Sequence, residues 1–473
     1  MSEQVFKYFG EICAIPHGSG NMEKIADYCV DFANSHSLKC VRDKADNVII
    51  YKNGSKGYEN SAPIILQGHL DMVCQKTADS DIDFLKDNIK TFIDGDFLKA
   101  ENTTLGADNG IAVSMIMAIL ADDELSHPPI EAVLTTDEEI GMIGASKIDF
   151  SLLSAKKMIN IDSEEEDVVT VSCAGGIDFT ATIPVKREVK KGSRVTLTLT
   201  GLKGGHSGVE INKGRVNADT LMGRFLNHMS KTEDFEIISL NGGDKGNAIP
   251  NRCVAELVVT NPDLFKTNAE NYLNVIKNEI SARENSFEFK VDVTDKGEYS
   301  VIDARQKQNI IFSLCTAPNG IMEMSAEIEN LVETSLNLGI LKTENDKIIL
   351  NFALRSNKQS ALDALKERLA AFFGLTNAEI EVSGHYPPWE YKENSDLREL
   401  YTKNYKSVFG KEVKVEAIHA GLECSVFASN IPELDCIAIG PDMFDVHTVN
   451  EKLSISSTDR IFKMLLKLLK ESK

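Results

Sequence analysis

The order of short apolar runs along the chain is the feature that most restricts its fold. In the first third, the runs 62–67 (APIILQ), 131–136 (EAVLTT) and 158–162 (MINID) each have the length of one buried strand. Stretches with a helical pattern occur at 22–36 and 109–122. Short buried strands that alternate with helices are typical of an α/β domain whose central sheet is mostly parallel. We therefore expect such a domain to begin near the start of the chain.

A different pattern fills the middle of the chain, from about Ile177 to about Tyr386. Alternation with period 2, as in VTLTLT at 195–200, indicates strands, and antiparallel strands with helices on one face would make this an α+β region. The expected strands are 195–200, 253–259, 287–293, 309–315, 320–325, 347–354 and 378–383, and the expected helices are 218–229, 268–283 and 360–373. Two runs of strand, helix and strand resemble each other, which indicates a weak internal repeat.

The α/β pattern returns near the end of the chain. Helices are expected at 395–409, 421–429 and 456–471, and strands at 413–418 and 435–439. A chain of 473 residues is also too long for one ordinary core. The sequence therefore predicts one α/β domain formed by 1–177 and 389–473, interrupted by an α+β insertion at 178–388 that is built of two weak repeats.

Composition excludes several classes of partner and location. The formal net charge of −21 argues against nucleic acid and anionic membrane surfaces as partners. No apolar run approaches the roughly 20 residues of a membrane span, and the first residues lack the pattern of a secretory signal. The nine cysteines are scattered and form no CxxC pair, which is typical of reduced thiols. These features predict a cytoplasmic protein.

Polar residues follow the expected buried strands of the α/β domain, at the edge where ligands bind in open α/β sheets. Two histidines and several carboxylates collect there: His69 and Asp71 after 62–67, Asp108 at the start of 109–122, Asp137, Glu138 and Glu139 after 131–136, Asp162 at the end of 158–162, and His447 after 435–439. Each has an ordinary explanation when taken alone. An isolated histidine is usually a surface residue, Asp108 is a helix N-cap, and three adjacent acids form a solvated loop.

Their joint placement favours a metal site over these separate explanations. Imidazole and carboxylate groups are the ligands of zinc and related ions in catalytic sites, and paired ions lie about 3.5–4 Å apart. The positive charge of two divalent cations balances the negative charge of three carboxylates (Asp108, Glu139 and Asp162) and one bridging hydroxide. Without a cation, the same carboxylates would raise one another's pKa values.

The motifs around these residues resemble a known family. GHLDMV, TLGADNG, LTTDEEIGMIGA, INIDSEEE, CAGG, GLKGGHSG, GNAIPNR and HAGLEC occur in this order, followed by a late loop with His447. Together they resemble the aminoacyl-histidine dipeptidases, also called Xaa-His or cytosol non-specific dipeptidases, which are co-catalytic zinc hydrolases. The resemblance extends from about Phe6 to Ile455.

The resemblance implies a ligand set and a catalytic base. Two Zn²⁺ ions per subunit, replaceable by Co²⁺ or Mn²⁺, would be held by His69 and Asp162, by Glu139 and His447, and by Asp108 as the bridge. Asp71 is similar to the carboxylate that fixes the imidazole of a ligand histidine. Glu138 is similar to the general base that takes a proton from the attacking water and later protonates the leaving amine.

The insertion resembles the lid domain of that family, and three of its residues match lid positions. His206 matches a histidine that stabilises the oxyanion, and Asn247 and Arg355 match residues that contact the substrate. A guanidinium suits a peptide carboxylate, although Arg355 could instead form a surface ion pair. Glu423, chosen by its charge, is a candidate partner for a free substrate amine, and a structural role is equally open.

One motif departs from the family. A proline usually follows the last ligand, in the form His-Ser/Thr-Pro-Asp/Glu, whereas this chain has 447-HTVNE-451. Glu451 is the candidate for the acidic residue of this tail, displaced by one position. The ligand role of His447 survives this change, and the geometry of its loop is the feature placed in doubt.

The function implied is hydrolysis of unblocked dipeptides, with Xaa-His or broad specificity. An N-acyl amino-acid amidohydrolase of the same superfamily is the alternative, although the long two-part lid favours the dipeptidase. A metal-stabilised binding protein without activity is a third hypothesis. The presence of all the expected metal ligands and of the expected base Glu138 argues against it. The expected partner is a small peptide, and a homodimer is left open.

Overall fold

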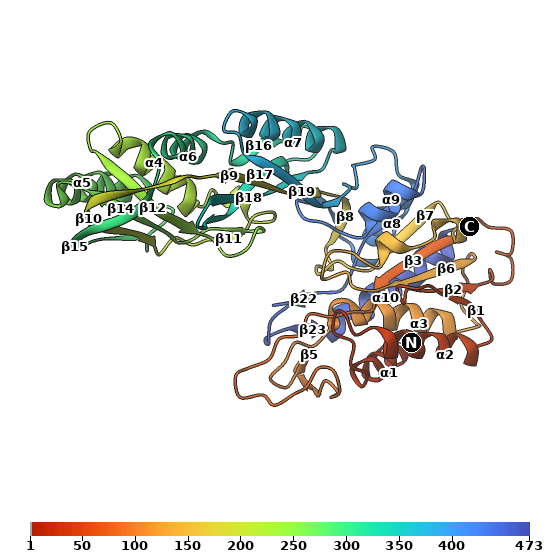
Figure 1. Ribbon diagram of the computed structural model, residues 1–473. Coiled ribbons are helices and arrows are strands. Elements are labelled where there is room, and N and C mark those ends of the chain that lie inside the picture. The colour runs from red at the N-terminus through yellow and green to blue at the C-terminus, as the bar shows by residue number, and fades with distance from the viewer. Residues whose placement is uncertain (1) are drawn as a thin grey trace. The chain divides into compact units, whose positions relative to one another are not determined.

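The computed structural model describes residues 2–473 and divides into two compact units, each with its own hydrophobic core (Figure 1). Unit 1 comprises the chain up to Cys173 together with Trp389–Ala417 and Leu422–Lys473, and unit 2 comprises Ala174–Pro388 and Ile418–Gly421. The sequence-based division into 1–177, 178–388 and 389–473 stays a prediction, because contacts alone do not test which segments fold independently. None of the helices within residues 2–473 has the length and apolar content that a bilayer crossing requires.

The central sheet of unit 1 is mixed. Its eight strands follow the order β1-β2-β6-β3-β7-β21-β8-β20. These are β1 Lys39–Arg42, β2 Val48–Lys52, β6 Ile130–Thr135, β3 Ile64–His69, β7 Lys157–Asn160, β21 Asp435–Ala438, β8 Val168–Cys173 and β20 Lys414–Ile418. Strands β6, β3, β7 and β21 pair in parallel, whereas β1, β2 and β8 pair antiparallel with their neighbours. The mostly parallel sheet expected from the sequence is thus limited to the four central strands. At one edge, β1 and β2 are antiparallel because a short connection makes them a hairpin.

Helix α3 (Ala107–Ala121) is buried on nearly all sides, which matches its apolar sequence. It packs against β3 and against α1 (Ser2–Cys13). Gly68 in β3 permits this close approach, because a Cβ there would lie 2.6 Å from the side-chain oxygen of Asn109 and 2.8 Å from the Cβ of Ala112. The start of α3 is therefore fixed next to the end of β3. Other helices of unit 1 are α2 Glu23–Ser35, α8 Asp396–Phe409, α9 Cys424–Asn430 and α10 Ile455–Glu471.

A second, four-stranded sheet in unit 1 has no counterpart among the expected elements. Its order is β22-β23-β5-β4, with β22 Met443–Phe444, β23 Lys452–Ser454, β5 Phe97–Ala100 and β4 Thr91–Asp94. Strands β22 and β23 are antiparallel neighbours, so the loop between them, which contains His447, is held at both ends. Strands of two to four residues are too short to give a periodic signal in the sequence.

Unit 2 contains a nine-stranded sheet in which the strands pair antiparallel. Its order is β15-β10-β14-β12-β17-β18-β9-β19, with β16 beside β17. The strands are β15 Glu288–Ile302, β10 Arg187–Thr200, β14 Cys253–Val259, β12 Phe235–Gly242, β17 Val332–Thr343, β18 Lys347–Ser356, β9 Gly175–Pro184, β19 Glu379–Tyr386 and β16 Gly320–Met324. Figure 1 shows helices α4, α5, α6 and α7 on the same face of this sheet.

Two strand–helix–strand runs occupy comparable places in this sheet. Strands β14 and β15, joined by α5 (Pro262–Ile280), lie on either side of β10, and β18 and β19, joined by α7 (Gln359–Gly374), lie on either side of β9. The two halves meet at β12 and β17, which share the single pair Gly242 and Leu341. The weak repeat stays a prediction, since similar connectivity does not establish a shared origin.

The strand expected at 309–315 is wrong, because this segment lies in helix α6 (Ala304–Thr316). Its buried apolar residues, Ile310, Ile311 and Leu314, have helical spacing and lie on one side of the helix. Asp303 caps the helix by accepting the backbone N–H groups of the second and third residues after it. The adjacent β-branched residues in this run favour a strand. The helix forms instead because Asp303 caps its start and its buried residues have helical spacing.

Asp219 in α4 (Ala218–Met229) makes the stability of the protein depend on pH. Its side chain is fully buried, and within residues 2–473 its carboxyl oxygens have no hydrogen-bond partner of standard geometry. Burial raises its pKa to about 8, against a small opposing effect of the Cys253 thiol. Because the folded protein then holds this proton more tightly than the unfolded chain, the stabilisation is lost as pH rises from about 4 to about 8.

We expect Asp219→Asn to remove this loss of stability. The variant should match the native chain near pH 4 and exceed it near pH 8 by a few kcal/mol, since one pKa unit corresponds to about 1.4 kcal/mol. Urea unfolding of both proteins at several pH values measures the difference between them. A difference that does not change with pH would contradict the assignment.

Candidate active site

The candidate site of unit 1 is formed where neighbouring strands of the central sheet end. Strand β3 ends at His69, β6 ends just before the acids at 137–139, and Asp162 follows β7. Asp108 lies in the first turn of α3, where its backbone departs from helical geometry, and the Asp108–Asn109 peptide bond is cis. The side chain of Asn109 accepts the N–H of His69 and donates to the carbonyl of Ile161. The start of α3 is thereby tied to the ends of β3 and β7.

Asp108 lies between two histidines from distant parts of the chain. Its Oδ1 atom is 3.2 Å from Nε2 of His69, and its Oδ2 atom is 3.0 Å from Nε2 of His447. Asp162 approaches the same nitrogen of His69 at 3.6 Å, and Glu139 approaches that of His447 at 2.9 Å. Potential ligand atoms therefore form two groups, each within 4.8 Å, that share Asp108.

The electrostatics of these groups fit divalent cations. Burial, together with the charges of Asp108 and Glu139, raises the pKa of Asp162 to about 6. Hydrogen bonding to Asp108, and then to Glu139, raises the pKa of His447 to about 11. The Oε1 atom of Glu139 is buried and, apart from its contact with Nε2 of His447, has no hydrogen-bond partner among the described residues. Three carboxylates and two imidazoles aimed at one another are a suitable donor set for two cations.

Glu138 is positioned beside these groups. It forms a further potential ligand group with His69 and Glu139. Burial raises its pKa well above the usual value, and Asp162, Glu423 and Glu139 add to this, against an opposing effect of His69. A carboxylate with a raised pKa can accept and return a proton near neutral pH.

Asp71 connects the acidic run to His69. Its carboxylate accepts the N–H groups of Glu138 and Glu139 at 2.9 and 3.2 Å and the hydroxyl of Ser19 at 2.8 Å. Nδ1 of His69 lies 3.4 Å from this carboxylate but donates to the main-chain carbonyl of Asp71 at 3.0 Å. This bond leaves Nε2 of His69 free to face Asp108. Asp71 thus orients the acids through their backbone as well as the imidazole.

Asp137 is held by a segment near the start of the chain. Its side chain accepts the N–H of Gly20 at 2.6 Å, and its backbone has a positive φ of 52°. The loop after it closes on itself, because Met142 and Ile143 donate to the carbonyls of Glu138 and Asp137. The run of three acids therefore turns sharply at its first residue. The sequence analysis gave Asp137 no role, and Ser19 and Gly20 carried no signal that could have identified them.

Substitutions of Asp137 should test this contact. Asp137→Asn keeps an oxygen acceptor and tolerates positive φ, whereas Asp137→Gly tolerates the backbone and removes the acceptor. We expect the asparagine variant to stay within about twofold of the native kcat and the glycine variant to lose about tenfold or more, with a smaller change in KM. Steady-state kinetics with circular dichroism as the folding control measure this. Equal kcat values for the two variants would count against the contact.

Glu451 supports the loop that leads to Asp108. It is buried, and its carboxylate accepts the N–H groups of Leu105, Gly106 and Ala107 at 2.7 to 3.1 Å, with Asp108 itself at 3.4 Å. Glu451, the candidate for the acidic residue of the family's tail motif, thus binds the backbone N–H groups next to Asp108. His447, four residues earlier, has a positive φ of 62° in the same loop.

Glu423 lies inside unit 1 and is fully buried. One of its oxygens, Oε2, accepts from Gln67 at 2.5 Å and from Thr135 at 2.6 Å, while Oε1 has no partner within residues 2–473. Burial raises its pKa to about 8. This position gives Glu423 a structural role at the ends of β3 and β6, and its expected contact with a substrate amine stays a proposal.

In unit 2, His206 and Asn247 come together. The short strand β11 (Gly205–His206) pairs with β13 (Ala248–Ile249), and the N–H of Ser207 donates to the carbonyl of Asn247. The Nδ1 atom of His206 faces the N–H groups of Gly208 and Val209 at 3.1 and 3.2 Å. The ring proton is therefore on Nε2.

Arg355 belongs to the same region of unit 2. It is 8% exposed and donates to the hydroxyl of Tyr386 at 2.7 Å. Burial, with the nearby charge of Arg355, lowers the pKa of His206 to about 4 and that of His419 to about 3, so both rings are neutral at pH 7. His419, to which the sequence analysis gave no role, contacts Ser335 at 2.7 Å. The guanidinium of Arg355 is thus near the rings of His206 and His419, and Asn247 is adjacent to His206 through the backbone of the β11–β13 pair.

Comparison with known proteins identifies the class to which this fold and site belong. The model of peptidase family M20/M25/M40 matches residues 65–471. The cytosol non-specific dipeptidase of Escherichia coli (strain K12) is 38% identical over 473 residues, which cover 99% of this chain and 97% of the relative. The chain belongs to peptidase family M20/M25/M40.

Solved structures agree with this assignment. The aminoacylhistidine dipeptidase of Vibrio alginolyticus superposes with a TM-score of 0.90 at 36% identity, covering 98% of this chain and 96% of that one. An aminopeptidase from Bacillus cereus superposes with a TM-score of 0.60 at 14% identity, covering 100% and 99%. The second likeness concerns the fold alone, a mixed α/β peptidase fold.

Proposed function

We propose that this protein is a metal-dependent dipeptidase that hydrolyses unblocked dipeptides, with Xaa-His or broad specificity. The observation that carries the proposal is the position of Asp108, which two potential ligand groups share, with Glu138 in a third group beside His69 and Glu139. The relatives similar over nearly the whole chain are named as dipeptidases, which supports the substrate class. The name of the relative from Escherichia coli also places it in the cytosol, and we propose the same compartment here.

The metal centre is proposed to hold two zinc ions, with Co²⁺ or Mn²⁺ as substitutes. His69 and Asp162 would serve one ion, Glu139 and His447 the other, and Asp108 both. When bound, such ions lower the pKa of water and polarise a carbonyl group. Asp71 fixes the imidazole of His69 through its carbonyl, which keeps the Nε2 atom directed at the centre.

Glu138 is proposed to act as the general base and then as the general acid. It would take a proton from the attacking water and deliver it to the leaving amine. Its raised pKa suits both tasks, because the carboxylate then binds a proton more readily than an ordinary glutamate does. Asp71 holds the backbone of Glu138, which sets the direction of the side chain.

Unit 2 is proposed to act as the lid, formed by two repeated halves, with three residues for the substrate. His206, neutral and protonated on Nε2, would donate to the oxyanion. Arg355 would bind the peptide carboxylate, and Asn247, paired close to His206, would contact the substrate backbone. Association into a homodimer is compatible with these roles and is left to measurement.

A substrate panel tests the proposed function against the alternative. Unblocked dipeptides, including β-alanyl-histidine and several Xaa-His pairs, are compared with N-acetyl and N-succinyl amino acids on zinc-loaded protein. We expect turnover of the unblocked dipeptides and little turnover of the acylated compounds. Turnover of only the acylated compounds would make the protein an amidohydrolase instead, and no turnover of either would favour a binding protein.

A further inference from the structure

Arg355 in β18 carries a buried positive charge that no ion pair neutralises within the described part of the chain. Its side chain is 8% exposed, and no carboxylate of residues 2–473 lies within ion-pair distance of it. One terminal nitrogen donates to the hydroxyl of Tyr386 at 2.7 Å, and the N–H at Nε is buried without a hydrogen-bond partner among these residues. Because a buried charge with an unused donor is costly, this guanidinium is suited to receive an anion.

The register of the unit 2 sheet brings Tyr386 to this guanidinium. Gly176 in β9 is the cross-strand partner of Arg355 in β18 on one side and of Tyr386 in β19 on the other. Directly opposed residues share one face of a sheet, and strands two places apart are about 10 Å from each other. Two long side chains can therefore meet above the glycine. A Cβ at Gly176 would lie 2.5 Å from the hydroxyl oxygen of Tyr386, so the absence of a side chain there gives the phenol its space.

An irregularity in β19 gives Tyr386 its place in this row. Ser383 pairs with Asp178, and Tyr386, three residues later, pairs with Gly176, which is only two residues from Asp178. The strand therefore carries one extra residue between these two pairs, and Gly384 within this stretch has a positive φ of 59°. Bulges of this kind re-aim a side chain and are common beside active sites. Regular pairing would have placed the residue before Tyr386 opposite Gly176.

The guanidinium is the dominant charge of this region of unit 2. Burial raises the pKa of Asp178, against a smaller opposing effect of Arg355, and the two groups form no ion pair. The rings of His206 and His419, whose pKa values Arg355 helps to lower, are neutral at pH 7. A carboxylate that enters the region therefore meets one cation, and the bond to Tyr386 sets the orientation of that cation.

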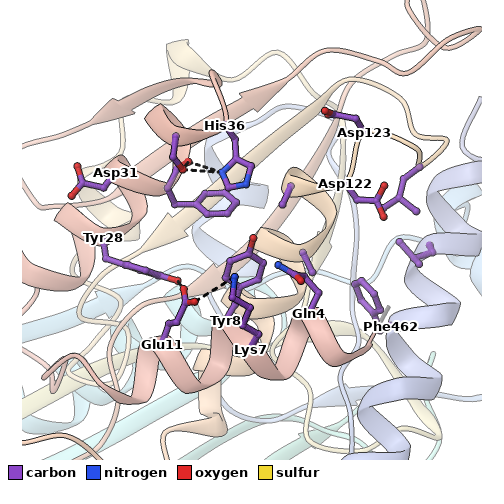
Figure 2. Close-up of a pocket in the computed structure, with 16 residues that line it drawn as sticks. Gln4, Lys7, Tyr8, Glu11, Tyr28, Asp31, His36, Asp122, Asp123 and Phe462 are labelled. Atoms are coloured by element: carbon purple, nitrogen blue, oxygen red, sulfur yellow. Dashed lines mark hydrogen bonds and ion pairs between the residues drawn. The ribbon is translucent and has the colours of Figure 1, made fainter.

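A cavity of about 850 Å³ between α1, α2, α10 and the last turn of α3 in unit 1 lacks a feature of this kind (Figure 2). Its polar side chains contact one another or the backbone. Glu11 accepts the hydroxyl of Tyr28 at 2.6 Å and lies 3.7 Å from Lys7, and the Nδ1 atom of His36 is 2.9 Å from the carbonyl of Phe32. None of its lining residues, all of which the structure describes, has a buried side-chain nitrogen or oxygen without a hydrogen-bond partner. Arg355 differs from them in this respect.

We propose that Tyr386 is a positioning residue that directs the guanidinium of Arg355 at the C-terminal carboxylate of the substrate and thereby sets a preference for peptides with a free C-terminus. This inference rests on the proposed dipeptidase function and deepens it. Tyr386 accepts one N–H of the guanidinium, which fixes its plane and leaves the buried N–H at Nε for the carboxylate. A guanidinium that is already fixed loses less freedom when the substrate binds.

The preference for a free C-terminus is measured with two substrates, alanyl-histidine and alanyl-histidine amide, on zinc-loaded protein. We expect the native enzyme to favour the free acid in kcat/KM by at least about 100-fold. Tyr386→Phe removes only the hydroxyl and should reduce this preference at least about tenfold, mainly through a higher KM for the free acid. An unchanged preference would overturn the proposal. Equal losses for both substrates would show a purely structural role and would also overturn it.

Two further variants test whether Tyr386 acts through Arg355. Tyr299→Phe makes the same chemical change in β15, at the opposite edge of the sheet, and should keep the native preference. Arg355→Met should remove the preference, and the addition of Tyr386→Phe should change the remaining ratio by less than about twofold, because no guanidinium is left to be positioned. A further large loss in the double variant would contradict the proposal. Thermal unfolding of each variant is the control for folding.

The same assay separates failure of this inference from failure of the proposed function. If the native protein cleaves neither substrate, the proposed dipeptidase function fails, and this inference fails with it. If the native protein cleaves the free acid and the amide equally well, hydrolysis of the peptide bond stands, and only the role given to Tyr386 and Arg355 is lost.

Discussion

Glu138→Gln is expected to remove nearly all dipeptide turnover while leaving the fold and the metal content unchanged. The amide has the size of the carboxylate but cannot accept a proton at neutral pH, so the step that activates water is lost. Loss of a general base costs about 10²–10⁴-fold in rate. The measurements are kcat and KM for a good dipeptide, metal content by elemental analysis, and the thermal unfolding temperature.

A matched change separates this effect from a general loss of charge. Glu165→Gln replaces an exposed carboxylate three residues beyond Asp162 and should stay within about twofold of the native rate. If Glu138→Gln kept more than a tenth of the native kcat, Glu138 would not be the base. If it lost activity together with one metal ion, Glu138 would act as a ligand, a role its distance to His69 and Glu139 permits.

The sequence predicted that most residues of the candidate site lie close together, because strand ends and helix starts converge in an α/β sheet. His69, Asp108, Asp162 and His447 were each expected after a strand or at a helix start, and all four side chains meet in unit 1. This prediction required only that the carboxyl ends of the parallel strands meet at one edge of the sheet, which follows from the topology. The family resemblance then assigned roles that spacing alone could not give.

The contacts that hold these residues in place could not be predicted. Ser19 and Gly20 bind Asp71 and Asp137 across more than fifty residues of chain, and a serine or glycine in a loop has many ordinary roles. Glu451 accepts four backbone N–H groups of the loop at 105–108, a geometry that depends on the fold of both segments. Such contacts require the tertiary structure.

The errors in the fold have a similar origin. A short apolar run such as 309–315 suits a strand or a helix equally, and in α6 the cap by Asp303 and the packing of Ile310 decide the outcome. Strands β1 and β2, at one side of the sheet, are antiparallel because a tight connection joins them. This makes the sheet mixed without changing which of its residues are buried. Periodicity identifies which residues are buried more reliably than it identifies their partners.

Removal of the metal ions is expected to abolish turnover and to lower the unfolding temperature. Asp108, Glu139 and Asp162 share one site, and without cations their mutual repulsion opposes the folded state. Ions that bind only the folded protein stabilise it in proportion to the logarithm of their concentration over Kd. Chelator treatment, elemental analysis and then titration with zinc or cobalt measure activity and stability together.

Single substitutions sharpen this test, because the two groups of ligands share only Asp108. Asp162→Asn and Glu139→Gln should each weaken the binding of one ion and leave the other ion bound, whereas Asp108→Asn should weaken the binding of both ions. Substitution of a residue that binds the metal is expected to lower the affinity of the protein for that ion by about 10- to 100-fold or more. Two tightly bound ions in Asp108→Asn would exclude Asp108 as the bridge. Full activity after verified removal of all metal would refute the proposed mechanism, since neither His69 nor His447 could then act as a ligand in turnover.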